Sequence, residues 1–229
     1  MSCGQTPKPE NKIPIGTASD EAREEFLKGR ALFEKLLAQN SLKHFDDAVN
    51  KDPDFAMAYY YRGLASPSAK EFFDNLKQAV ALVDHASEGE RLWILGFEAG
   101  VNADPTKRGE YYLQLVQAYP EDERAHTTLT SHYNAIQEYE SAIAEYKKAT
   151  ELAPDFSTAY NSLGYALRAV ERYDEAEEFK SSERQTSSHP TYCLSWLLPT
   201  KGRAIQSRPE DLARKAPTTT RFPPCVMRR

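Results

Sequence analysis

ERAHTTLTSHYNAIQEYESAIAEYKKATELAPDF, residues 123–156, contains two amphipathic segments separated by a short polar turn. Large apolar residues recur in its first half at the spacing of one helical face: Leu129, Tyr133 and Ile136. Its second half carries a stripe of small and large apolar residues: Ala142, Ile143, Tyr146 and Ala149. Gln137 and Glu138 form the turn, and Pro154 ends the second segment because proline has no amide hydrogen. The stretch predicts two packed helices.

Residues of the same type recur along the chain at an interval of 34 positions. The interval relates several sets of residues: Pro120 and Pro154; Leu95, Leu129 and Leu163; Tyr112 and Tyr146. A fixed interval of this length, with one helix pair in each unit, is the signature of a helical repeat.

These residues resemble the pattern of the tetratricopeptide repeat (TPR) family. Six of eight pattern positions in residues 123–156 hold an expected or similar residue: Leu129, Tyr133, Ala142, Tyr146, Ala149 and Pro154. His126 and Thr130 depart from the pattern, and His126 takes a large packing position, where we expect a buried histidine. The resemblance implies an all-α, right-handed superhelical solenoid of antiparallel helix pairs that serves as a binding scaffold rather than an enzyme.

The repeat predicts three parts of the chain. We expect a flexible tether over residues 1–17, a solenoid over 18–180 and a disordered, non-repeat basic tail over 181–229. The solenoid would hold about four units, the last one incomplete, with approximate bounds 22–55, 56–88, 89–122, 123–156 and 157–180. In the third of these stretches Arg108 stands where a small residue is expected.

The chain changes character near residue 180. Phe179 lies one position before the expected aromatic, and Glu183 takes a position that needs alanine. Residues 1–179 hold 19 Lys and Arg against 31 Asp and Glu, whereas residues 180–229 hold 10 against 3. The tail is interpreted as an out-of-frame or substituted end, a disordered basic arm or a second small domain. A missing polar end helix would expose an apolar face and favour self-association: Leu163, Ala166, Leu167 and Val170.

The amino terminus reads Met-Ser-Cys-Gly-Gln, which is similar to the mature start of a bacterial lipoprotein. Only two residues precede Cys3, so the charged region and the apolar core of an export signal are missing from the sequence as encoded. We therefore expect a cytoplasmic protein. If the start lies further upstream, the resemblance implies that Cys3 is acylated and that the protein is anchored in the cell envelope. The alternative is an ordinary disordered terminus with an incidental cysteine.

Candidate catalytic and metal-binding groups are sparse. Cys3, Cys193 and Cys225 are an odd number outside the repeats, which does not suggest a disulfide framework. His189 and Cys193 make two of the four ligands that a structural zinc site needs. There is no glycine-rich phosphate loop and no nucleophile elbow. The sequence predicts no catalytic residue, no metal and no cofactor.

The family resemblance implies a binding groove on the first helix of each pair. Its positions fall on these residues: Tyr60, Arg124, Thr127, Ser131, Asn134, Thr158, Asn161, Tyr165 and Arg168. We expect a protein or peptide partner rather than a small-molecule substrate, with a membrane involved only through an acylated Cys3. Two alternatives are an accessory module of a larger enzyme or regulator, and a less favoured nucleic-acid binder that acts through the basic tail.

Overall fold

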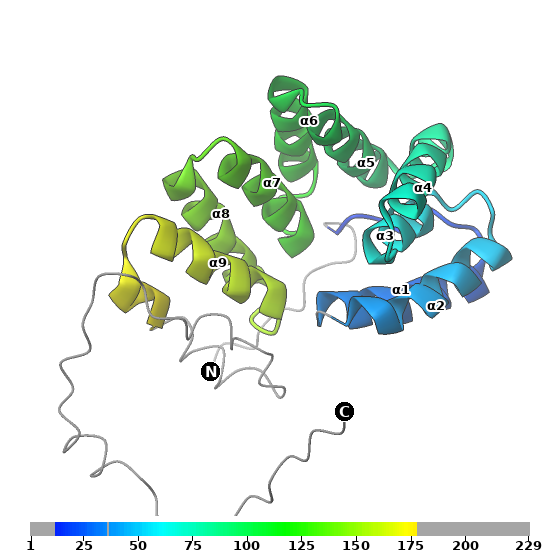
Figure 1. The fold of residues 1–229 in the computed structure, drawn as a ribbon, viewed down its shortest axis with the longest axis horizontal. Coiled ribbons are helices and arrows are strands. Elements are labelled where there is room, and N and C mark those ends of the chain that lie inside the picture. Colours follow the sequence, from blue (N-terminus) through cyan, green and yellow to red (C-terminus); the bar gives the residue numbers. More distant parts are fainter. Residues whose placement is uncertain (1–11, 36, 178–229) are drawn as a thin grey trace, which may run out of the picture. The chain divides into compact units, whose positions relative to one another are not determined.

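The structure, a computed structural model, describes residues 12–35 and 37–177, which belong to one compact unit. In this part of the chain the regular structure is helical, without a strand (Figure 1). Its α-helices are α1 (Asp20–Glu34), α2 (Ala38–Lys51), α3 (Ala56–Ala65), α4 (Ala69–Ala81), α5 (Glu88–Val101), α6 (Pro105–Ala118), α7 (Glu123–Ala135), α8 (Tyr139–Leu152) and α9 (Ser157–Ala169). A 3₁₀-helix, η2 (Val83–His85), follows α4.

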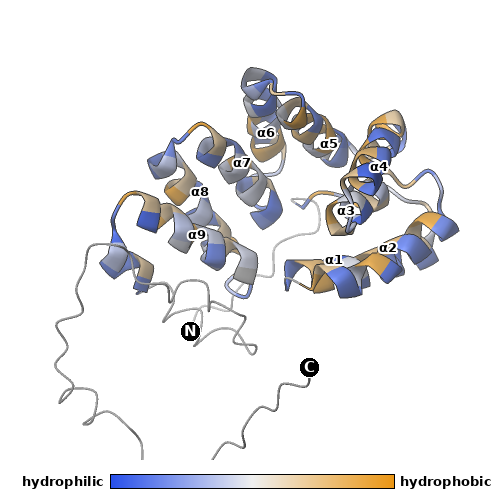
Figure 2. Cartoon of the chain, viewed as in Figure 1, coloured by the Kyte–Doolittle hydropathy of each residue, from blue (hydrophilic) through white to orange (hydrophobic). Residues whose placement is uncertain are grey.

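Consecutive helices pack as pairs: α1 with α2, α3 with α4, α5 with α6 and α7 with α8. A fifth pair begins with α9 and continues with the first helical turns of residues 173–177. Hydrophobic and hydrophilic residues alternate along each helix (Figure 2), so one side can pack while the other meets water. The expected all-α solenoid of helix pairs is confirmed.

The turn inside a helix pair repeats with the sequence interval. Ala103, Gln137 and Glu171 each follow a first helix and have positive φ values of 57°, 63° and 61°. These positions lie 34 residues apart, and each belongs to a connection of three residues that reverses the chain. A left-handed backbone costs a residue with a Cβ atom about 1 kcal/mol. The repeat therefore extends to backbone conformation as well as to residue type.

Each of two helix pairs closes through a ring on its second helix that lies against a glycine on its first. A Cβ atom added at Gly96 would lie 2.3 Å from the ring of Tyr112, and one at Gly29 would lie 2.7 Å from the ring of Phe45. These contacts bring the helix backbones close together. Thr130 takes the equivalent place in the fourth pair, where it is fully buried and its hydroxyl donates to the Thr127 carbonyl at 2.5 Å.

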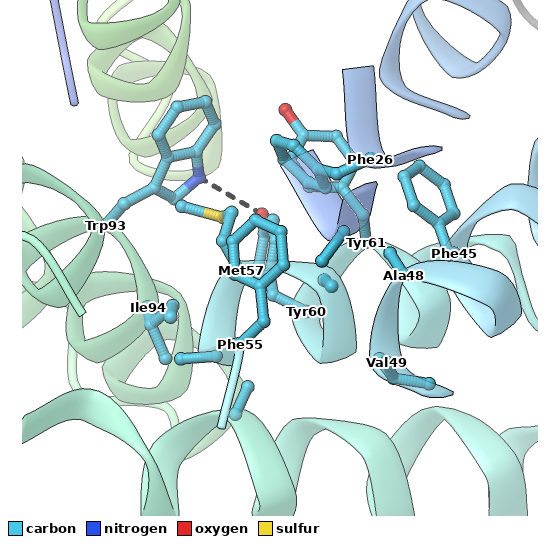
Figure 3. Close-up of a cluster of buried hydrophobic side chains, with 14 of the residues drawn as sticks. Phe26, Phe45, Ala48, Val49, Phe55, Met57, Tyr60, Tyr61, Trp93 and Ile94 are labelled. Atoms are coloured by element: carbon cyan, nitrogen blue, oxygen red, sulfur yellow. Dashed lines mark hydrogen bonds between the residues drawn. The ribbon is translucent and has the colours of Figure 1, made fainter. Parts of the chain in front are cut away.

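The largest core cluster joins the first three pairs through aromatic side chains (Figure 3). The ring centroid of Phe26 lies 4.9 Å from that of Phe55 and 5.5 Å from that of Tyr61. The Trp93 indole Nε1–H donates to the Tyr60 hydroxyl at 3.2 Å, which satisfies both polar groups inside the cluster. Aromatic packing thus fixes α1, α3 and α5 against one another.

Residues 12–17, here named the N-terminal strap, differ from the flexible tether that the sequence predicts. The Ile13 amide donates to Asp122 Oδ2 at 2.9 Å, and the Gly16 amide donates to Glu90 Oε2 at 2.9 Å. The Ile13 side chain packs against the core cluster. Asp122 and Glu90 lie at the starts of α7 and α5. Their carboxylates also accept hydrogen bonds from backbone amides at the starts of these helices. Side chains at two helix starts therefore hold the strap.

The end of the repeat array also differs from expectation. Of the four residues that we expected to be partly uncovered, Leu163, Ala166 and Leu167 are buried with exposed fractions of 3% or less, and Val170 is half-buried. Self-association through this end stays a prediction, and the burial of Leu163, Ala166 and Leu167 does not support it. The interpretations of Cys3, Phe179, His189 and the tail over 181–229 lie outside the described residues.

Among the described residues, the structure contains no helix that is both long and apolar enough to cross a membrane.

The left-handed turn generates a first prediction. Replacing Gln137 by glycine should raise the free energy of unfolding by about 0.5 kcal/mol, because relief of backbone strain exceeds the entropic cost of glycine. Urea unfolding measures this change. As a control, Glu151→Gly in the exposed face of α8 should lower the same quantity by about 1 kcal/mol. A loss of stability with Gln137→Gly would show that this turn is not strained.

The strap generates a second prediction. Asp122 accepts from the amides of Ile13, Arg124 and Ala125, so Asp122→Ala should lower the free energy of unfolding by roughly 2 kcal/mol or more. Asp104 caps α6 through the Lys107 amide and has no strap contact, so Asp104→Ala should cost about 1 kcal/mol. Equal losses for the two variants in urea unfolding would contradict a stabilising strap.

Candidate functional site

A cavity of about 270 Å³ is bounded by helices from every pair of the array. Its wall comes from α1, α3, α5, α6, α7 and the residues around the start of α9. Most of its large side chains are aromatic: Phe33, Tyr60, Tyr61, Trp93, Phe97, Tyr112 and Phe156. Such a wall can bury apolar groups of a ligand, and it offers few donors and acceptors for hydrogen bonds.

Polar side chains of the wall gather mainly on α7 and its neighbours: Glu34, Arg108, Arg124, Thr127, Thr128, Ser131 and Thr158. The Thr127 hydroxyl donates to the Glu123 carbonyl at 2.7 Å, and the Ser131 hydroxyl donates to the Thr128 carbonyl at 2.6 Å. Because these hydroxyls already donate within their helix, their remaining capacity is to accept. Ser131 uses that capacity for Arg108.

An ion pair joins the first helix pair to the fourth across one side of the cavity. Arg124 donates to the two carboxylate oxygens of Glu34 at 2.6 and 3.0 Å, and it also pairs with Glu123. The guanidinium lies 5.4 Å from the centroid of the Phe156 ring. The Thr158 hydroxyl donates to the Glu34 carbonyl at 3.0 Å, which brings α9 to the same point. Arg124 therefore shapes the cavity while its charge is neutralised.

Five of the nine predicted partner-binding residues line this cavity: Tyr60, Arg124, Thr127, Ser131 and Thr158. Asn134, Asn161, Tyr165 and Arg168 are not part of its wall. The Asn134 amide nitrogen donates to the Tyr146 hydroxyl at 3.1 Å and so bridges α7 and α8. Tyr165 is 46% exposed on α9. The structure thus brings residues of α3, of α7 and of the start of α9 together, and it leaves Asn134 and the later residues of α9 outside the wall.

Sequence reasoning missed most of the aromatic wall and its two further charged residues, Glu34 and Arg108. Aromatic residues on first helices, such as Tyr61, Trp93 and Phe97, could have indicated an aromatic groove. Burial raises the pKa of Tyr112 to about 12, against the opposing effects of Arg108 and Ser131, so this tyrosine stays protonated at neutral pH. Arg108 stands where the family pattern has a small residue, and this departure could have indicated that Arg108 belongs to the site.

A second cavity of about 290 Å³ lies beneath the N-terminal strap. It shares Tyr61, Trp93 and Arg124 with the first cavity. Burial raises the pKa of the Glu90 carboxyl group. The hydrogen bonds that Glu90 accepts from the Gly16 and Ser87 amides lower this pKa, but burial has the larger effect. The strap thus lines this second cavity together with three residues that also form the first one.

Within residues 12–35 and 37–177, the structure contains no group of three or more His, Cys, Asp or Glu side chains that could hold a metal ion.

His126 anchors α7, which supplies three of the four Ser and Thr hydroxyl groups of the cavity. As expected it is buried, with 5% of its surface exposed. Its Nδ1 lies 2.5 Å from Glu145 Oε2, and its Nε2 lies 2.9 Å from the Pro120 carbonyl. Because both partners are acceptors, the ring is best satisfied when both nitrogens carry a proton. Burial lowers the pKa of His126, but the bonds to Glu145 and Pro120 outweigh it and the pKa is raised.

The raised pKa generates a third prediction. A group with a raised pKa in the folded state stabilises the fold fully below its unfolded pKa of about 6.5 and loses this contribution as pH rises through the folded value. The free energy of unfolding should therefore fall as the pH rises above about 6.5, and this fall should be smaller in His126→Gln. His85 is exposed, so His85→Gln should keep the wild-type dependence. Identical pH profiles for all three proteins would refute the charged His126.

Comparisons with known proteins agree with the helical repeat. Residues 132–167 match the family model described as TPR repeat, and no curated protein matches the chain. The chain is similar in structure to PilW, a type IV pilus biogenesis factor, at 14% identity over 74% of this chain and 79% of that one, with a TM-score of 0.46.

Two further solved structures are similar to this chain. YrrB, described as a TPR protein with an unusual peptide-binding site, has 18% identity over 72% of this chain and 86% of that one (TM-score 0.43). The TPR2B domain of yeast Sti1, in a complex with pHsp70, has 26% identity over 43% of this chain and 79% of that one (TM-score 0.41). The family-model match spans residues 132–167, from the end of α7 to α9, and the family resemblance predicted from the 34-residue interval is confirmed.

Proposed function

We propose that this protein is a non-catalytic scaffold that binds a segment of a partner protein at the cavity among its first helices. The observation that carries the proposal is the wall of that cavity, in which seven aromatic side chains surround about 270 Å³. Aromatic side chains supply large contact areas and are the residues that most often dominate binding energy at protein interfaces.

The size of the cavity favours a side chain of a larger partner over a complete small molecule. Sites for drug-sized ligands range from about 300 to 1,000 Å³, so this cavity lies just below that range. One or two apolar side chains of an extended or helical segment would fill it. The rest of such a segment would continue over α9, where Asn161, Tyr165 and Arg168 are the predicted contacts.

Hydrogen-bonding groups at the cavity suit a peptide backbone. Thr127 and Ser131 lie one turn apart on α7, and both line the wall. The Thr127 oxygen can accept from a backbone amide of a bound segment, whereas the Ser131 oxygen already accepts from Arg108. The partner would thus be recognised by an apolar anchor and by a few polar contacts beside it.

A peptide selection tests this proposal. Random 12-residue peptides displayed on phage should yield sequences that bind the full-length protein with micromolar Kd or better. Thr127→Trp places a large side chain in the cavity and should weaken the selected peptides at least about 10-fold, which corresponds to 1.4 kcal/mol. Fluorescence anisotropy of labelled peptides measures this change.

A matched variant separates the cavity from the rest of the surface. Glu151→Trp adds the same side chain to an exposed position of α8 and should leave peptide affinity within about twofold of wild type. Circular dichroism checks that both variants stay helical. The proposal fails if no peptide is enriched, or if the two tryptophan variants bind the peptides equally well.

A further inference from the structure

Arg108 occupies a position of the second helix where the family pattern has a small residue, and the structure shows how it fits. A Cβ atom added at Gly100 on α5 would lie 3.0 Å from Arg108 Cδ and 3.2 Å from its Nε. The glycine therefore leaves the space through which the long side chain of Arg108 reaches the cavity. The guanidinium carbon lies 5.7 Å from the centroid of the Tyr112 ring.

The hydrogen bonds of this guanidinium are incomplete. Its Nη2 donates to the Ser131 hydroxyl at 2.8 Å. Its Nε is buried and has no hydrogen-bond partner among the described residues. A buried donor without an acceptor costs about 1–3 kcal/mol, and more when the group is charged.

The charge of Arg108 is also uncompensated. Three charged side chains line the cavity: Glu34, Arg108 and Arg124. Glu34 is bound through both carboxylate oxygens by Arg124. Across residues 12–35 and 37–177, no carboxylate lies within 4.0 Å of the Arg108 guanidinium, so the wall keeps one unpaired positive charge. Because aromatic groups line the same cavity, an anion brought into it would interact with Arg108 more strongly than in water.

We propose that the cavity binds a carboxylate carried beside a large apolar group, presented by a segment of the partner protein. The apolar group would lie among Trp93, Tyr60 and Phe97, and the carboxylate would accept from Arg108. Planar guanidinium groups suit carboxylates because two parallel N–H bonds can form. This inference rests on the proposed function and specifies the chemistry of its ligand.

The test compares two probes of the same size that differ at one end, 3-phenylpropionate with a charged carboxylate and 3-phenylpropanamide with a neutral amide. Each is titrated into the full-length protein, and the indole N–H resonance of Trp93, a residue of the cavity wall, is followed by NMR. A Trp196→Phe variant assigns that resonance, since the chain has two tryptophans. We expect 3-phenylpropionate to bind at least about 10-fold more tightly than the amide, the difference that one charge-assisted hydrogen bond typically supplies.

Variants assign the difference to Arg108. In Arg108→Gln the acid and the amide should bind within about twofold of each other, and the amide should keep its wild-type affinity because the aromatic wall is unchanged. Arg108→Lys keeps the charge and should retain part of the preference. Arg91 is an arginine on α5 that pairs with Glu88 outside the cavity, so Arg91→Gln should behave like wild type.

Three outcomes would overturn the inference. They are equal binding of the two probes to wild type, a preference for the acid that survives in Arg108→Gln, and no shift of the Trp93 resonance with either probe. The proposed function is judged separately, by whether selected peptides lose affinity in Thr127→Trp. Peptides that depend on Thr127 but bind Arg108→Gln normally would leave the scaffold proposal intact and remove the carboxylate.

Discussion

The close approach of two helices within each pair is the constraint on which the rest of the structure depends. Gly96 and Gly29 remove the side chain where a ring of the second helix must lie, so Tyr112 and Phe45 contact the backbone of the first helix. A pair held at that distance has one apolar side left to bury, and it buries that side against the next pair. The aromatic wall of the cavity is made by the first helices once they are aligned in this way.

The cavity itself depends on contacts between parts of the chain that are distant in sequence. Arg124 and Glu34 are 90 residues apart, and Thr158 and Glu34 are 124 residues apart. In a solenoid whose units contact their neighbours alone, such bonds would not form. Here they join α7 and α9 to the end of α1. The charge that remains unpaired, on Arg108, stands out because every other charge of the wall has a partner.

Local pattern predicted much of the fold. The apolar stripes of residues 123–156 gave the two helices, and the turn at Gln137 was expected from its two polar residues. Tyr60, Arg124, Thr127, Ser131 and Thr158 follow from the resemblance, because first-helix positions face the cavity in each unit. The strap did not follow, since Ile13 and Gly16 lie in a short proline-containing stretch without helical periodicity. Nor did the ion pair of Glu34 with Arg124, because no local spacing specifies a partner 90 residues away.

The strap has a consequence for the order in which this protein can fold. Residues 12–17 leave the ribosome before any of the described helices, yet their acceptors are Glu90 at the start of α5 and Asp122 at the start of α7. The strap therefore has no final partner until most of the repeat array has been synthesised. Once bound, it ties the beginning of the chain to the third and fourth helix pairs. A repeat array can in principle unfold one unit at a time. Because the strap joins distant units, we expect this one to unfold in a single cooperative step.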